Sequence, residues 1–569
     1  MTQALATPIS QTDLEDRLDR ARAALLRGDA LQAATDLIAA AMVAPQAFEL
    51  QYALAAAMLA LGDAQAADQA LETARLLHSL RLLAGMGVDL KRLRAEPDFA
   101  VDIGMTLYRN KHVAMACAAF GMAISAGYKG QQGLLSYGLA LQHQGLAEEA
   151  IRVFRAAAEL YPSAGTHQFL LYPHFLVQDG IARHAQEARR WAALYGRAPP
   201  GLTPPAIDRN WRRPLRIGFV NPSFIQVQSR QFVGTVFEHL DRSQFEVFLY
   251  PNAEDDPAAW SAPVTVRPIG RMNDATAAAL IRSDRIDVLV DCWGHTAGNR
   301  LTMFTHRPAP VQTTWVNYQQ TTGLDCMDYT IHADDVDAPD MAEAFTETIW
   351  RVGATPCAFR PDGVAETTPA PVLRNGYVTF GSFVHPSRLT DSTVDAWAAI
   401  LKGRPDSRLV LKYGYYDDPV LRGVTAARFL GRGVDPDRLE FRGHTTGQAY
   451  VAEFGDIDLA LDPSPCPGGT TTFEAMTRGV PVLTLKGETF YSRIGVPIVA
   501  GAGMPDMVAD SWDAYVARAV EVSADAATLQ TLRDRVLPGF AASPFRDEAG
   551  CARVLGEAFQ GMFRRWAES

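Results

Sequence analysis

A 34-residue period in the first third of the chain constrains the fold more than any other feature. The dipeptide Gly28-Asp29 interrupts one helical pattern, and Gly62-Asp63 interrupts another 34 residues later. Lys111 and Gly145 have the same spacing further along. A helix pair of this length is too small to bury its own apolar face, so successive pairs stack on one another. The period therefore predicts a helical solenoid.

The period is typical of tetratricopeptide repeats, and it predicts a repeat domain over residues 1–200. It is lost between Leu76 and Pro97, where we expect an irregular or split array. Solenoids of this kind usually present a concave surface to a protein partner. We therefore expect the array to bind a protein acceptor. A generic helical domain that aids solubility or dimerisation would show the same alanine-rich pattern.

The composition excludes several classes of protein. A formal net charge of −11 does not suit a general nucleic-acid binder, which needs a basic face. No apolar run is long enough to span a bilayer, and Met1 to Asp16 lack the pattern of a signal peptide. The six cysteines are scattered without metal-ligand spacing. We expect a cytoplasmic protein of several domains, with no metal and no bound cofactor.

After residue 200 the pattern changes to short β-rich apolar runs that alternate with helical segments. Such runs predict parallel strands covered by helices. They fall into two sets, which predict two doubly wound, Rossmann-like lobes over residues 210–365 and 366–569. The fold expected for the whole chain is α/β with an all-α N-terminal part. The predicted strands are Leu215–Val220, Phe245–Tyr250, Ile286–Asp291, Val311–Val316, Tyr329–His332, Tyr377–Phe383, Arg408–Lys412, Leu439–Arg442, Ile457–Asp462 and Val480–Leu485.

The most specific motif is the strand–loop–helix–strand segment at residues 455–485. Two glycines after the strand let the backbone approach a ligand, and three threonines put hydroxyl and N–H groups at a helix start, where an anion binds well. A glutamate one turn into the helix is placed to accept hydrogen bonds from ribose hydroxyls. A helix cap alone would use the same residue types, but the whole pattern favours a nucleotide-sugar site. The predicted substrate-binding residues are Gly468, Gly469, Thr470, Thr471, Thr472 and Glu474.

This segment, with EAMTRGVPV inside it, resembles the nucleotide-sugar half of two-lobed (GT-B) glycosyltransferases. The wider region resembles the O-linked N-acetylglucosaminyltransferase family, which also joins tetratricopeptide repeats to a two-lobed catalytic region. LRIGFV at 215–220 and FEVFLY at 245–250 resemble its first strands, SPF at 543–545 its closing motif, and residues 291–329, with RPAPVQ and TTG…MDY, its longest signature. The resemblance implies a transferase that moves a sugar from a nucleotide sugar to Ser or Thr of a protein.

The resemblance also implies roles for residues of both lobes, with the acceptor on the first lobe and the nucleotide sugar on the second. Arg388 matches the family's essential lysine, which holds the leaving diphosphate. His385 is expected to contact the nucleotide and is, with His295 and Asp291, a candidate to receive the acceptor proton. His295 could instead line the cleft, and Asp291 could cap a turn. Further residues expected to border the substrate cleft are Arg230, Thr321, Thr322 and Gly323.

The chain differs from the family at positions that carry catalytic or phosphate-binding residues there. Two histidines of the loop after the first strand are absent, the phosphate-binding lysine is an arginine, and the histidine beside the threonines is a glycine. The arginine keeps the charge and can hold a phosphate through two hydrogen bonds. These positions are Val227, Gln231, Arg388 and Gly469, while His385 replaces a glutamine and Gln319-Gln320-Thr321 replaces PGT.

These departures predict a donor other than UDP-N-acetylglucosamine. They resemble those of bacterial flagellin glycosyltransferases, which transfer nonulosonic acids from CMP donors, and a single phosphate would suit the altered phosphate loop. That resemblance implies flagellin as the acceptor. Two alternatives remain open, a UDP-N-acetylglucosamine-type transferase and a catalytically inactive protein that binds partners through its repeats. A sugar-nucleotide epimerase is disfavoured by the array and by RPAPVQ.

Overall fold

The computed structural model describes residues 10–177, 179–203, 205–318, 320–334, 341–353, 355–363 and 368–569. The chain forms two compact units, each assembled from three separate stretches of sequence. Unit 1 contains Met1–Ala157, Pro369–Ser464 and Ser511–Thr531, and unit 2 contains Ala158–Thr368, Pro465–Asp510 and Leu532–Ser569. The three domains expected from the sequence, 1–200, 210–365 and 366–569, stay a prediction.

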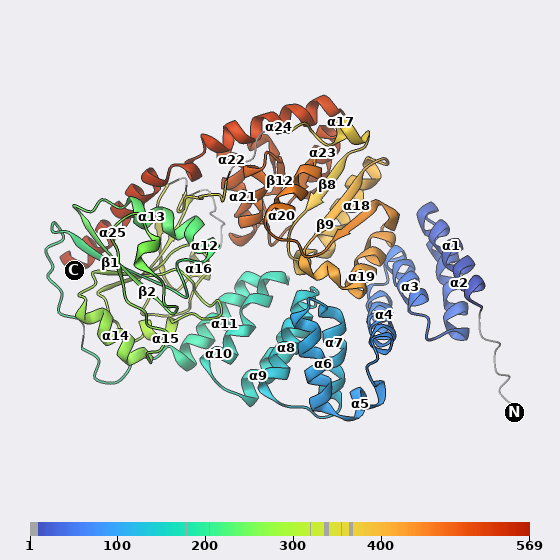
Figure 1. Cartoon of the computed structure of the whole chain (residues 1–569), viewed down its shortest axis with the longest axis horizontal. Helices are drawn as coiled ribbons and strands as arrows, with labels where there is room; N and C mark the ends of the chain where they lie inside the picture. The colour runs from blue at the N-terminus through green and yellow to red at the C-terminus, as the bar shows by residue number, and fades with distance from the viewer. Residues whose placement is uncertain are drawn as a thin grey trace. The chain divides into compact units, whose positions relative to one another are not determined.

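The helical array of unit 1 confirms the predicted repeats (Figure 1, blue to cyan). Gly28 and Gly62 end α1 and α3 in the left-handed region, with φ of 89° and 79°. Lys111 and Gly145, which follow α6 and α8, have φ of 70° and 82°. The array contains α1 (Gln11–Arg27), α2 (Ala30–Val43), α3 (Phe48–Leu61), α4 (Ala64–Gly85), α5 (Leu90–Ala95), α6 (Pro97–Arg109), α7 (Val113–Ser125), α8 (Gln131–His143) and α9 (Ala147–Leu160).

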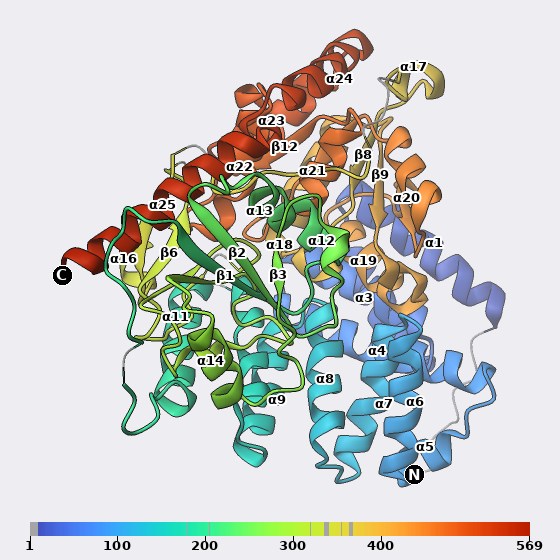
Figure 2. The ribbon, with the colours of Figure 1, turned by 60° about the vertical axis from the view of Figure 1, so that its left-hand side comes forward.

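In two repeats, the first and second helices pack through the same contact between a glycine and a phenylalanine. A Cβ at Gly104 of α6 would lie 2.6 Å from the ring of Phe120 of α7, and a Cβ at Gly138 of α8 would lie 2.3 Å from the ring of Phe154 of α9. The two glycines are 34 residues apart, and so are the two phenylalanines. The rings pack this closely only because glycine has no Cβ. Figure 2 shows α6, α7 and α8 side by side.

The irregular stretch predicted between Leu76 and Pro97 has a structural counterpart. Helix α4 is 22 residues long and so runs past the end of a normal repeat. The short helix α5 then intervenes before α6 restores the period. The loss of the period therefore marks one long helix and one extra helix within the array.

Unit 1 also contains four parallel strands in the order β10-β9-β8-β11. The strands are β8 (Thr379–Ser382), β9 (Arg408–Lys412), β10 (Leu439–Arg442) and β11 (Leu459–Leu461), and the helices are α17 (Val372–Asn375), α18 (Asp391–Gly403), α19 (Pro419–Leu430), α20 (Gly447–Glu453) and α23 (Trp512–Val522). Helices α18, α19 and α23 bury an apolar face, as the alternating pattern predicted.

Helix α19 packs on the array, so that the repeats and these strands share one core. Val424 and Ala427 of α19 lie in a buried cluster with Ala55 of α3 and Leu71 of α4. The hydroxyl of Tyr52, also on α3, donates to the carbonyl oxygen of Val420 at 3.2 Å. Burial of apolar surface is the main favourable term in such a contact. The array is therefore an integral part of unit 1.

Unit 2 is built on a parallel sheet of seven strands in the order β3-β2-β1-β4-β5-β6-β7. A further parallel pair, β12 with β13, belongs to the same unit. The strands are β1 (Leu215–Asn221), β2 (Phe245–Pro251), β3 (Thr265–Val266), β4 (Val288–Asp291), β5 (Val311–Thr314), β6 (Tyr329–His332), β7 (Thr348–Arg351), β12 (Val482–Leu485) and β13 (Val508–Ala509).

The helices of unit 2 include the last helices of the predicted repeat domain. They are α10 (Ala164–His167), α11 (Gly180–Tyr195), α12 (Val227–Ser229), α13 (Thr235–His239), α14 (Asp274–Ser283), α15 (Leu301–Phe304), α16 (Met341–Ala344), α21 (Thr470–Thr477), α22 (Gly495–Gly501) and α25 (Glu548–Glu568). Helix α24 (Ala526–Ala541) begins in unit 1 and ends in unit 2. A helical N-terminal region followed by parallel strand sets is the predicted fold, and it is confirmed.

Candidate functional site

The carboxyl ends of β1, β4 and β5 bring several predicted residues together in unit 2. Parallel pairing sets Val220 of β1 opposite Asp291 of β4, and Asp291 opposite Thr314 of β5. Asn221, the next residue of β1, therefore lies beside Asp291 at the same edge of the sheet. In open α/β sheets this edge is where ligands bind. We call these strand ends and the loops that follow them the acceptor-side site.

Asp291 is a buried carboxyl with one oxygen hydrogen-bonded and one without a partner in the described residues. Its Oδ2 accepts a 2.7 Å hydrogen bond from the backbone N–H of Gly294. Its Oδ1 is buried and has no partner among the residues that the structure describes. Burial raises the pKa of Asp291 to about 7, although the N–H groups of Gly294 and Trp293 oppose this shift. A carboxyl that titrates near neutrality and has an open oxygen is suited to accept a proton.

The turn that binds Asp291 requires glycine at position 294. Gly294 has a φ of 54°, which side chains rarely adopt. A Cβ at this position would also lie 2.2 Å from the ring of Tyr318. The hydrogen bond to the Asp291 carboxyl is therefore supported by a backbone conformation that packing holds in place.

His295 follows in the same loop and is buried as a neutral ring. Its Nε2 lies 2.8 Å from the carbonyl oxygen of Thr322, so Nε2 donates and Nδ1 is left as the acceptor. That Nδ1 has no partner in the described part of the chain. Burial lowers the pKa of His295 to about 4. The ring of Trp191, from α11, stands perpendicular to it at 4.6 Å between centroids.

The threonines expected to border the substrate cleft support the loop instead of exposing their hydroxyls. Thr321 and Thr322 are completely buried. The Thr321 hydroxyl and the Thr322 backbone N–H each donate to the carboxylate of Glu347, both at 2.7 Å. Gly323 has a φ of 75°, and a Cβ there would lie 2.4 Å from the backbone of α11. A contact of these residues with substrate stays a prediction.

Two residues of this loop region have partners or burial that no sequence motif indicates. Glu347, which lies just before β7, carries no local signal, because only its partners across the loop give it a role. Gln320 was noted as a departure from the family, and its Nε2 is buried without an acceptor in the described residues. Gln319 lies outside the described residues. Gln320 is therefore a buried amide in the loop after β5, without an acceptor for its Nε2 in the described part of the chain.

The loop after β1 has no imidazole where the resemblance expects two. Val227 of α12 is 53% exposed, whereas Gln231 is buried. Arg230 is exposed, and its guanidinium lies 5.9 Å from the centroid of the Trp260 ring. The chain continues in a π turn at Arg230–Gly234, followed by α13. Turns of this type are frequent at functional sites.

The predicted anion-binding segment adopts the expected loop and helix in unit 2. Helix α21 begins at Thr470, and Gly469 precedes it without a side-chain cap. Among the described residues, no acceptor is found for the N–H groups of Thr470 and Thr471. A Cβ at Gly469 would meet no atom within 4 Å, so the position is open. Gly468 and Thr472 are buried and Glu474 is half-buried, and their binding roles stay predictions.

The other two predicted residues lie in unit 1, in the loop after β8. The Nδ1 of His385 accepts hydrogen bonds from the N–H of Ser387 at 3.1 Å and from its hydroxyl at 2.7 Å. The ring proton is therefore on Nε2. Burial, then His143 and Arg388, lower the pKa of His385 well below its usual value. Arg388 ends the short turn Pro386–Arg388 and is half-buried.

Two tyrosines that follow β9 complete this second group, which we call the β8-loop site. The ring of Tyr413 lies 4.7 Å from that of His385, and the ring of Tyr415 lies 5.2 Å from it. No sequence motif includes them. Their place directly after a predicted strand was a usable signal, because the loops at strand carboxyl ends carry ligands.

Two general properties bear on both sites. The described residues include no group of three or more His, Cys, Asp or Glu side chains that could hold a metal ion. Across the same ranges, no helix combines the length and the hydropathy needed to cross a membrane.

The model of glycosyl transferase family 41 matches residues 155–355 and 366–549. These ranges cover more than half of the chain and include Asp291, His295, Arg388 and the segment 468–474. The chain belongs to glycosyl transferase family 41. Membership confirms the resemblance that RPAPVQ and the strand–loop–helix segment carried.

Other proteins similar to this family 41 chain have related names. It is 31% identical over 399 residues to the probable UDP-N-acetylglucosamine–peptide N-acetylglucosaminyltransferase SPINDLY of Oryza sativa, with 68% of this chain and 42% of that protein covered. The SPINDLY protein of Arabidopsis thaliana is 31% identical over 421 residues, with 71% and 45% covered. The chain thus spans less than half the length of these relatives. A mutant of Thermobaculum terrenum O-GlcNAc transferase has a TM-score of 0.73 at 26% identity, covering 100% of this chain and 99% of that one.

Proposed function

We propose that this chain transfers a sugar from a nucleotide sugar to the hydroxyl of Ser or Thr in a protein acceptor. The observation that carries the proposal is the family 41 match, which extends over both strand regions and includes every residue predicted for catalysis. The names of the relatives, probable peptide N-acetylglucosaminyltransferases, support a protein acceptor. We propose that the helical array recruits this acceptor, as solenoids commonly do.

Asp291 is the proposed base of the reaction. Its open Oδ1 would take the proton of the acceptor hydroxyl as that oxygen bonds to the anomeric carbon of the sugar. The bond between this carbon and the phosphate oxygen breaks, and the electron pair leaves with the nucleotide. His295, neutral with an open Nδ1, is the alternative base. The two differ in pKa, so a pH profile separates them.

Charge that develops on the leaving phosphate needs fixed donors. Arg388 is the cation that the resemblance assigns to this role. The N–H groups at the start of α21 favour an anion, because Thr470 and Thr471 have no acceptor for them within the described residues. Each feature by itself suits a nucleotide phosphate.

There are two candidate sugar donors. UDP-N-acetylglucosamine follows from the names of the relatives. A CMP-activated nonulosonic acid, with flagellin as the acceptor, is favoured by the departures from the family, namely the missing imidazoles at Val227 and Gln231 and the open space at Gly469. One phosphate needs fewer partners than two, which is the physical reason for this second candidate.

Mass spectrometry of the products decides between the donors. The full chain is incubated with UDP-N-acetylglucosamine or with a CMP-nonulosonic acid, in the presence of flagellin or a Ser/Thr peptide. Release of UDP or of CMP identifies the nucleotide, and the mass added to the acceptor identifies the sugar. Arg388→Ala serves as the control for enzymatic turnover. Release and transfer with neither donor would support an inactive protein that binds partners through its repeats.

A further inference from the structure

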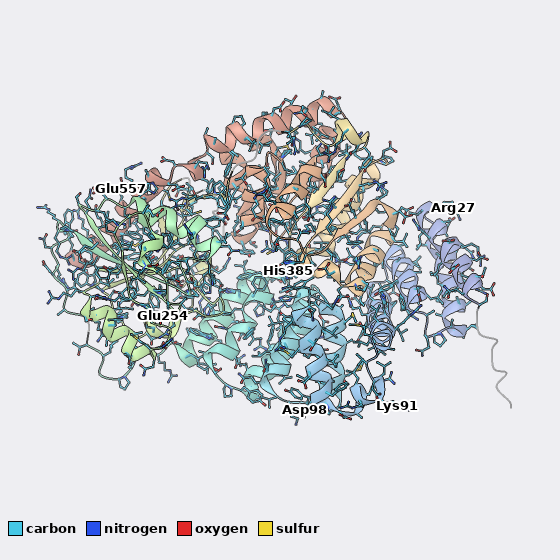
Figure 3. The ribbon with its side chains drawn as sticks, viewed as in Figure 1. Arg27, Lys91, Asp98, Glu254, His385 and Glu557 are labelled. Carbon is cyan, nitrogen blue, oxygen red and sulfur yellow. The ribbon has the colours of Figure 1, made fainter. Side chains whose placement is uncertain are left out.

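Residues of the helical array reach the β8-loop site inside unit 1. His143, the last residue of α8, has its ring 4.9 Å from that of His385 and 4.8 Å from that of Tyr415. Lys111, in the turn after α6, places its Nζ 6.0 Å from the centroid of the Tyr415 ring. In Figure 3 the labelled His385 lies where the repeat helices meet the segment that holds β9 and α19. The array therefore forms one wall around His385.

The backbone of the array approaches the same loop. Gly145 follows α8 with a φ of 82°, and a Cβ at this position would lie 3.7 Å from the Cα of Ser387. Ser387 is the residue whose N–H and hydroxyl both donate to His385. The turn after α8 thus packs on the residue that sets the tautomer of His385.

His143 is itself fixed and uncharged. Its Nδ1 lies 3.3 Å from the hydroxyl of Tyr108 on α6, and the two rings stack at 5.7 Å. Burial lowers the pKa of His143 to about 4, with a further contribution from Lys111. The ring therefore packs as a neutral aromatic group at neutral pH. It covers His385 without adding a charge to the site.

These contacts make the Nε2–H of His385 a hydrogen-bond donor with a defined direction. Its Nδ1 accepts from the N–H and the hydroxyl of Ser387, which leaves the Nε2–H as the ring's donor. The rings of His143, Tyr413 and Tyr415 pack around its ring, at 4.9, 4.7 and 5.2 Å between centroids. A neutral imidazole held in this way donates from Nε2 in one direction. The charged or titratable groups that face it are His143, Arg388, Tyr413 and Tyr415. Behind them, Tyr108 contacts His143 and Lys111 contacts the Tyr415 ring.

We propose that the helical array is part of the donor site, and that His143 is a positioning residue that holds His385 with its Nε2–H directed at an oxygen of the donor nucleotide. The proposal rests on the proposed function and goes beyond it. It gives the array a role in donor binding in addition to the recruitment of the acceptor.

The test compares His143→Ala and His143→Phe with a matched histidine elsewhere in the array. His78 of α4 has the same local setting, with its Nδ1 3.2 Å from the hydroxyl of Tyr52 and its ring stacked on Phe48 at 3.9 Å. Burial likewise lowers the pKa of His78 to about 4. Its ring contacts are within the array, so His78→Ala removes a comparable buried ring without touching His385.

The first measurement is an NMR titration of His385 in the full chain, which needs no ligand. In the unsubstituted protein the pKa of His385 should lie well below that of an exposed histidine, about 6.5. Loss of the ring in His143→Ala admits water, so the pKa should rise towards that value. His143→Phe, which keeps an apolar ring, should stay near the starting value, and His78→Ala should leave the titration unchanged.

The second measurement is the Kd of UDP and of CMP by calorimetry at pH 7.5 and at pH 5.5. For the nucleotide that the unsubstituted chain binds, His143→Ala should raise the Kd by about 10-fold at pH 7.5. This is the usual effect of losing one hydrogen bond to a charged group. At pH 5.5 the loss should shrink, because a protonated His385 attracts phosphate. His78→Ala should bind normally.

The outcomes separate the two proposals. If the chain transfers sugar but His143→Ala changes neither the His385 titration nor the nucleotide Kd, the positioning role is wrong while the proposed function stands. If the unsubstituted chain binds neither UDP nor CMP, the proposed function fails, and the donor part of the inference fails with it.

Discussion

The carboxylate of Asp418 accepts a 2.7 Å hydrogen bond from the backbone N–H of Ala114. Ala114 lies in the first turn of repeat helix α7, whereas Asp418 directly precedes α19. The same carboxylate accepts from the N–H of Val420 at 2.9 Å and so also caps α19. One completely buried side chain therefore accepts hydrogen bonds at the N-terminus of a helix of the array and caps the N-terminus of a helix of the strand region of unit 1.

Asp418→Ala should destabilise the protein by about 3 kcal/mol, because several buried N–H groups lose their acceptor together. The measurement is urea unfolding of the full chain. The matched control is Asp89→Ala, which removes an exposed cap of α5 that has no partner outside its own helix. That change should cost about 1 kcal/mol. Equal losses in the two variants would contradict the role of Asp418 in joining the array to the strands.

The pH dependence of transfer should identify the base. If Asp291 receives the acceptor proton, kcat/KM should rise as the pH increases through about 7, because the carboxyl must be ionised to act and burial raises its pKa to that value. Asp291→Asn should lower the rate by about 10²-fold or more without changing nucleotide binding. A profile that is flat from pH 5 to 8 would favour His295, whose pKa burial lowers to about 4.

Arg388→Ala should reduce transfer by about 10²–10³-fold, the usual effect of removing one donor from developing negative charge. Arg388→Lys should recover only part of the rate, since lysine keeps the charge but cannot form the bidentate hydrogen bonds of arginine. Val227→His should change little, because Val227 is largely exposed and its neighbours have also diverged. Steady-state rates of the three folded variants test this. Near-normal turnover in Arg388→Ala would show that another residue holds the phosphate.

Gly469→His should fold normally, because a side chain at this position points into open space. It restores the residue that the family carries beside the threonines. We expect it to raise the affinity for UDP relative to that for CMP, measured by calorimetry. Gly323→Ala is the contrasting change, because its φ of 75° and the 2.4 Å approach to the backbone of α11 should make it strongly destabilising. An unfolded Gly469→His variant would show that the space around position 469 is not open.

Elements with a strong local pattern were predictable from the sequence. The left-handed residues Gly28 and Gly62 ended helices where the period placed the breaks. Strand β6 (Tyr329–His332) was predicted with the bounds that it has. The edge strands β3 and β13 were missed, because two residues each give no apolar run, and β7 was missed because its residues are partly exposed.

By itself, the sequence determined the repeats, the buried strands and the residue types that follow each strand, because helix breaks and apolar periods are short-range properties of the chain. Only the tertiary structure decided what each polar side chain is free to do. The hydroxyl of Thr321 is occupied by Glu347, and His385 is enclosed by His143 of the array. Hydrogen-bond partners and loss of water depend on segments that are distant in sequence, so no local pattern records them.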